Sequence, residues 1–151
     1  MSFDSFLSQL KTKANELKTE ALKFKNKDFL NAAMAGSALI AMADGNISSE
    51  EKQKMIRFIE SNDALSVFST SDVIKAFQDF VAQIEFDKDI GEAKAYGAIG
   101  KMKSNQEAAK LLVRMHIAIA SSDGNFDDLE KKVAVKIIKE LQLNPAEFEL
   151  G

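Results

Sequence analysis

Apolar side chains recur along this chain with the period of an α-helix. Positions 3, 7, 10, 14, 17, 21 and 24 hold Phe, Leu or Ala, at alternating spacings of four and three residues. Side chains so spaced lie on one face of a helix, and lysines occupy the other faces here. The pattern predicts a first helix over residues 3–25.

The rest of the chain divides into helical segments at breaks rich in Gly, Asn, Asp and Ser. Two segments, 28–43 and 105–121, are apolar on nearly every face, which is typical of helices at the centre of a bundle. We expect Asp28 and Ser104 to cap these two helices, because short polar side chains accept hydrogen bonds from a helix's first amides. The other predicted helices cover 49–61, 70 or 71 to 85, about 90 to 102, and 127–141.

These segments predict an all-α fold, a single-domain bundle of about seven helices over residues 1–151. Glycine (7) and proline (1) are scarce, and apolar residues make up 46% of the chain, enough for one core. No apolar run approaches the roughly 20 residues that span a bilayer. The start of the chain lacks the apolar core of a secretory signal, so we expect a cytoplasmic protein.

Charge and composition exclude several classes of function. The net charge of −3 argues against nucleic acid as a partner, and the lack of cysteine excludes thiolate metal sites and redox thiols. We find no arrangement of Ser, His and Asp for nucleophilic catalysis and no Gly-rich phosphate loop. The single histidine, His116, lacks the nitrogen or sulfur partners of a zinc site, so we expect a structural residue. The chain is predicted not to be an enzyme and to have no small-molecule substrate.

The chain contains an internal duplication. Residues 44–47 read Asp-Gly-Asn-Ile and residues 123–126 read Asp-Gly-Asn-Phe, and Glu51 aligns with Glu130 at the same offset. The match predicts two related helix–loop–helix units, 28–61 and 105–141, that follow a Lys-rich N-terminal helix over 1–27.

The order of the helices predicts two ends of opposite charge. Short connections favour antiparallel neighbours, so alternate loops should share one end of the bundle. The loops near 44–49, 85–89 and 123–128 then meet, and they are rich in Asp and Glu. Lysines such as Lys101 and Lys103 gather at the opposite end.

The two acidic loops resemble half of an EF-hand calcium loop. Asp-Gly, five residues and Glu occur in order from Asp44 to Glu51 and from Asp123 to Glu130, without the earlier carboxylates of that pattern. One loop lacks the six to eight oxygens that Ca²⁺ takes, but two loops together can supply them, and oxygen ligands suit Ca²⁺, Mg²⁺ or Mn²⁺. The candidate ligands are Asp44, Asn46, Ser48, Glu51, Asp123, Asn125, Asp127 and Glu130.

The same loop residues also have a purely structural explanation. Glycine ends one helix, a Ser or Asp caps the next, and acidic side chains are favourable at a helix N-terminus. Ser48 followed by Glu51 fits a capping box. The sequence leaves cation binding and simple capping both open.

A second candidate site is the basic face of the first helix. Such a face can contact an anionic membrane surface or an acidic protein partner, or it can simply be solvated. The candidate partner-binding residues are Lys11, Lys18, Lys23, Lys25 and Lys27.

Three features of the chain together are typical of one family: the duplicated helices, the two (Ala/Ser)-Asp-Gly-Asn loops and a closing Leu-Asn-Pro-Ala-Glu-Phe stretch over 143–148. In these features the chain resembles the TerB family of tellurite resistance proteins. The similarity covers nearly the whole chain. It implies an all-helical bundle and a non-catalytic role in tellurite resistance and stress response. It also implies a metal site at the acidic loops, formed by Asp44, Asn46, Glu51, Asp123, Asn125 and Glu130.

The resemblance further implies work in a complex at the inner face of the membrane, with the integral membrane protein TerC and calcium-binding TerD-type proteins. Two functions are therefore expected. The first is an adaptor whose acidic end binds a divalent cation. The second is a metal-independent module that docks partners through oppositely charged ends.

Overall fold

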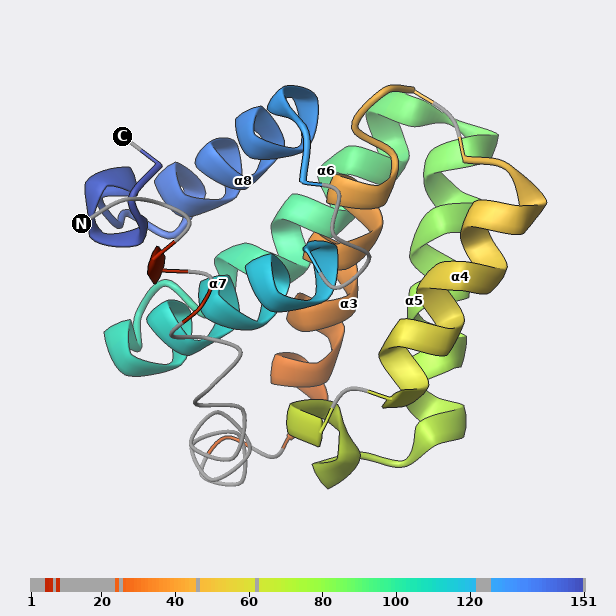
Figure 1. Cartoon of the computed structure of the whole chain (residues 1–151), viewed down its shortest axis with the longest axis horizontal. Helices are drawn as coiled ribbons and strands as arrows, with labels where there is room; N and C mark the ends of the chain where they lie inside the picture. Colours follow the sequence, from red (N-terminus) through yellow and green to blue (C-terminus); the bar gives the residue numbers. More distant parts are fainter. Residues whose placement is uncertain are drawn as a thin grey trace.

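The structure is a computed structural model that describes residues 5, 6, 8, 24, 26–45, 47–61, 63–121 and 126–150. These residues form α-helices and two short 3₁₀ helices, with no strand among them, which confirms the predicted all-α class (Figure 1). The predicted first helix lies almost entirely outside the described residues. The elements are α3 (Lys27–Ala41), α4 (Ser49–Ser61), η1 (Asp63–Val67), α5 (Thr70–Phe86), α6 (Lys88–Gly100), α7 (Gln106–Ala120), α8 (Asp128–Glu140) and η2 (Pro145–Phe148).

The helix bounds repeat the offset seen in the sequence. Helix α7 starts and ends 79 residues after α3, from 27 to 106 and from 41 to 120, and α8 follows α4 by the same step. The caps repeat as well. The Asn26 side chain accepts a hydrogen bond from the Phe29 amide at 2.8 Å, and the Asn105 side chain accepts one from the Ala108 amide at 3.2 Å. The same local signals therefore start the first helix of each unit.

Two of the predicted caps are wrong. Asn26 rather than Asp28 caps α3, and Asn105 rather than Ser104 caps α7. Both asparagines have extended backbone, which places the side-chain oxygen opposite an amide three residues on. Asp28 already lies in the first helical turn, where a carboxylate is favourable for a different reason, the positive end of the helix dipole.

The break predicted over 86–89 is also narrower than expected. Helix α5 continues to Phe86 and α6 begins at Lys88, so Asp87 alone separates them. Its side chain accepts a hydrogen bond from the Ile90 amide at 3.1 Å and so caps α6. A single capping residue is therefore enough to end one helix and start the next.

Helix α3 lies at the centre of the bundle and packs against α5, α6, α7 and α8 (Figure 1). Most residues of α3 and of α7 are buried, which agrees with their apolar sequences. The two helices approach closely where Gly36 faces His116, since a Cβ added to Gly36 would lie 2.1 Å from the His116 ring. This contact joins the first helices of the two repeat units.

The described parts of the loops gather as the connectivity predicts. Lys52 at the start of α4 forms an ion pair of 2.8 Å with Glu85 at the end of α5. At the other end of α3, Asp28 lies 4.0 Å from Lys101, beyond the end of α6. We call the first of these two ends the acidic end. Lys52, Lys54 and Lys88 also lie there, and its carboxylates are Asp44, Glu50, Glu51, Glu85, Asp87, Asp89, Asp127, Asp128 and Glu130.

Across the described segments, no helix is both long and apolar enough to cross a membrane.

Candidate binding site between the repeat loops

The first loop is held by its glycine and by its link to the core. Gly45 has a φ of +98°, a region that favours glycine, and its amide donates to the Met42 carbonyl at 2.9 Å. Ile47 is buried, and the Ser48 hydroxyl accepts a hydrogen bond from the Glu51 amide at 3.1 Å. These contacts start α4 and leave the Asp44 side chain exposed.

The second loop enters α8 through a capping box. The Asp127 carboxylate accepts a hydrogen bond from the Glu130 amide at 2.8 Å, and the Glu130 carboxylate accepts one from the Asp127 amide at 3.0 Å. Two amides of the first turn are satisfied in this way. Among the predicted ligands, Asn46, Asp123 and Asn125 lie outside the described residues.

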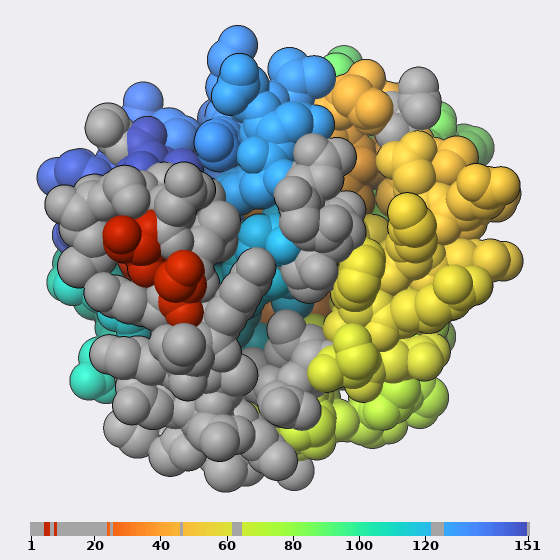
Figure 2. Space-filling view, in the orientation of Figure 1, coloured from red at the N-terminus to blue at the C-terminus, as the bar shows by residue number. Residues whose placement is uncertain are grey.

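The two loops meet at one pocket of about 280 Å³. Figure 2 shows the start of α8 beside the segment that joins α3 to α4. Acidic side chains from both repeat units line the pocket over an apolar floor, together with one lysine. The acidic residues are Asp44, Glu51, Asp127 and Glu130, the apolar ones include Ile40, Ile47, Met55 and Phe58, and the lysine is Lys54.

The described carboxylates do not form a cation site by themselves. Within the described ranges, no three acidic or histidine side chains lie close enough together to hold a metal ion. Asp127 and Glu130 each use one oxygen in the capping box, and Lys54 shares the pocket. A full oxygen shell would therefore draw on the side chains of Asn46, Asp123 and Asn125 as well.

Three residues of α4 that line this pocket are not among the predicted ligands. Lys54, Met55 and Phe58 follow Glu51 by three, four and seven residues. This spacing places them on one helix face with Glu51. The signal was present in the sequence, but it identifies a shared face and not what that face meets.

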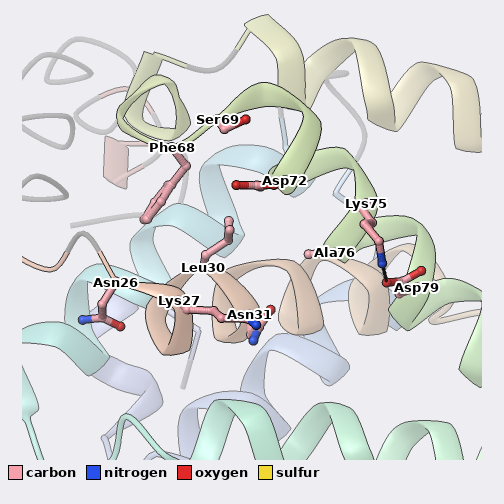
Figure 3. A pocket seen from close by; sticks show the side chains of 10 residues that line it. All are labelled: Asn26, Lys27, Leu30, Asn31, Phe68, Ser69, Asp72, Lys75, Ala76 and Asp79. Carbon is pink, nitrogen blue, oxygen red and sulfur yellow. Dashed lines mark hydrogen bonds and ion pairs between the residues drawn. The ribbon is translucent and has the colours of Figure 1, made fainter.

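Of the five predicted partner-binding lysines, the structure describes one. Lys27 is the first residue of α3 and is exposed. It lines a pocket of about 770 Å³ between the first halves of α3 and α5 (Figure 3). Lys75, on the opposite wall, pairs with Asp79 at 2.7 Å. Lys11, Lys18, Lys23 and Lys25 lie outside the described residues.

His116 lies in the core, away from both pockets. Its exposure is 1%, and its Nε2 nitrogen donates to the Ala32 carbonyl at 3.0 Å. Burial lowers the pKa of the ring to about 4, so the side chain is neutral at pH 7. In the described part of the chain its Nδ1 nitrogen has no hydrogen-bond partner. The His116 ring is therefore part of the packing contact between α3 and α7.

Comparison with known proteins places this architecture in a family. Residues 30–150, which include both loops and the pocket, match the family model described as Tellurite resistance protein TerB. The chain belongs to the TerB family. It is 39% identical over 115 residues to a protein of Alcaligenes sp named Tellurium resistance protein TerB, and the alignment covers 76% of this chain and 94% of that relative. No solved structure matches the chain.

Proposed function

We propose that this chain acts in tellurite resistance as a non-catalytic adaptor, and that the pocket between its two repeat loops is a binding site. The observation that carries the proposal is the meeting of Asp44 and Glu51 with Asp127 and Glu130 around one pocket. The name of the Alcaligenes relative supports the link to tellurium resistance. The proposed partners are the integral membrane protein TerC and the calcium-binding TerD-type proteins, both implied by the family resemblance.

The chemistry of the pocket favours binding over catalysis. Its described polar groups are carboxylates and the ammonium group of Lys54. The one histidine is buried elsewhere, and the chain has no cysteine. A general acid and base need partners that move their pKa values apart. We therefore assign this pocket no catalytic step.

We further propose that the pocket responds to a divalent cation, Ca²⁺, Mg²⁺ or Mn²⁺. Four carboxylates and a single lysine line the pocket, so its net charge is negative and favours a cation. The side chains of Asn46, Asp123 and Asn125 would complete the shell. The alternative is metal-independent docking of a protein partner, which is supported by the use of Ser48, Asp127 and Glu130 as helix caps.

An NMR titration separates these two functions. Amide spectra of the chelator-stripped protein are recorded while each cation is added, with Mn²⁺ read by line broadening. The test variant is Glu51→Gln combined with Glu130→Gln, because glutamine keeps a capping box but removes the charge. The control variant is Glu60→Gln combined with Glu107→Gln, two exposed carboxylates that do not line the pocket.

For a cation-responsive adaptor, shifts at Gly45 and Gly124 saturate together for one ion. The test variant loses this response and keeps its melting temperature, while the control variant keeps both. If no amide moves at millimolar cation, the metal-independent function holds. Equal responses in the test and control variants would show that binding lies outside this pocket.

A further inference from the structure

The acidic end also carries the large apolar side chains that the described chain exposes. These are Phe86, which is 93% exposed, Ile90 at 58% and Leu129 at 47%. Phe86 is the last residue of α5, Ile90 lies in the first turn of α6, and Leu129 lies in the first turn of α8. Figure 1 shows the junction of α5 with α6 and the start of α8 at the same end of the bundle. We call these three residues the apolar tip.

The exposure of Phe86 follows from the register of α5. The buried residues Val73, Phe77, Val81 and Ile84 lie on one face of that helix. Phe86 comes two residues after Ile84, about 200° further around the helix, and so points away from the core. Asp87 ends the helix immediately afterwards and caps α6. Because α5 ends in this register, the Phe86 ring lies in solvent.

The segments that join the tip to the loops are in contact. Lys52 of the first repeat unit pairs with Glu85, the residue before Phe86. A pocket of about 290 Å³ is lined by residues of the first loop and of the α5–α6 junction, including Gly45 and Glu85. The pocket between the repeat loops is lined by the same first loop and by Asp127, which lies two residues before Leu129. The apolar tip and the acidic loops therefore form one end surface.

Charge decides which kind of partner suits this surface. Phe86 lies between Glu85 and Asp87, Asp89 precedes Ile90, and Leu129 lies between Asp128 and Glu130. Lys88 and Lys52 also lie here, and Lys52 pairs with Glu85, but carboxylates outnumber the lysines. This frame repels an anionic membrane surface, and it repels the same end of a second copy of the chain. Lysine or arginine side chains complement it.

We propose that the apolar tip docks a protein partner that offers apolar cavities bordered by Lys or Arg. Exposed aromatic and aliphatic anchors within a charged rim match the usual anatomy of a protein interface. The proposal rests on the adaptor function proposed above, and it names the surface and the partner chemistry. It does not require a cation in the loop pocket.

The test uses two synthetic amphipathic helical peptides of the same pattern, one of Lys and Leu and one of Glu and Leu. Each is titrated into the ¹⁵N-labelled full chain without metal, and binding is read from amide shifts. The variants are Phe86→Ser and Leu129→Ser, which keep the net charge. The control is Ala146→Ser in η2, which is also exposed and lies outside the acidic end.

The Lys-Leu peptide should shift the amides of 85–90 and 128–130, and the Glu-Leu peptide should not. Phe86→Ser should weaken the binding by about 10-fold or more, as expected for an aromatic anchor, whereas Ala146→Ser should leave it unchanged. Because Phe86 is exposed, Phe86→Ser should keep its melting temperature and its response to cations. Loss of peptide binding with that response intact separates this proposal from the cation site.

Three results would overturn the proposal. The first is shifts spread over all acidic surfaces, with no effect of Phe86→Ser. The second is binding to phosphatidylglycerol vesicles that Phe86→Ser abolishes, which would make a membrane the occupant. The third is sedimentation of a dimer that the same variant dissociates, which would make a second copy the occupant.

Discussion

Acidification should destabilise this protein through one side chain, His116. The ring is buried in α7 against Gly36 of α3, and its Nε2 nitrogen donates to the Ala32 carbonyl. Among the described residues, the other buried polar side chains are Ser37 and Ser121. None of the described carboxylates is buried beside the ring to stabilise an imidazolium. Burial therefore lowers the pKa of His116 from 6.5 to about 4.

The size and sign of the effect follow from linkage. Above pH 6.5 the ring is neutral in both the folded and the unfolded chain, so pH has no effect through it. Between pH 6.5 and 4 only the unfolded chain binds the proton, so the free energy of unfolding falls with pH, by about 1.4 kcal/mol per unit. The loss is about 2 kcal/mol at pH 5 and about 3 kcal/mol near pH 4. Such a loss is a large part of the stability of a typical domain.

The measurement is urea unfolding at pH 7, 6 and 5, followed by circular dichroism. His116 is the one histidine of the chain, so no other side chain has an ordinary pKa inside this window. The comparison variant is His116→Gln, whose amide nitrogen reaches a similar position to Nε2 and does not titrate. The wild type should lose about 2 kcal/mol between pH 7 and 5, while the variant stays level. If the free energy of unfolding of the wild type did not change with pH, or fell equally in both proteins, His116 would not be a buried neutral ring.

Two glycine substitutions test the contact between α3 and α7 and the turn of the first loop. Gly36→Ala places a Cβ 2.1 Å from the His116 ring, so we expect a loss of about 2 kcal/mol or more in urea unfolding, as for overpacked cores. A loss below about 0.5 kcal/mol would contradict this close contact. Gly45→Ala meets no atom within 4 Å, but its φ of +98° is unfavourable for alanine. Gly45→Ala should lower the free energy of unfolding by about 1 kcal/mol and leave the melting cooperative. A variant more stable than the wild type would contradict the positive φ of Gly45.

Local signals in the sequence determined the fold class and the repeat. The period of apolar side chains predicted the helices, and the bounds of α4 were predicted to the residue. The Asp-Gly-Asn loops marked the ends of helices because glycine readily takes a positive φ, as Gly45 does. Each of these features depends on neighbours within one or two turns, so periodicity and capping chemistry are sufficient to find it.

Other features depend on residues far apart in the chain. The meeting of Glu51 with Glu130 at one pocket was predicted only by assuming that neighbouring helices run antiparallel. The apolar floor of that pocket and the contact of Gly36 with His116 were not predicted. Periodicity identifies which face of a helix is apolar, but not which helix that face meets or at what angle.

The exposed tip shows the same division between local and tertiary information. The sequence identifies Phe86 as a large apolar residue, which is more often buried than exposed. Only the structure shows that α5 continues to Phe86 and turns at the single residue Asp87. That register carries the ring away from the core and into the acidic end. Helices, caps and repeat units were thus determined locally, whereas packing of the helices around α3 decided which loops, acids and apolar side chains share a surface.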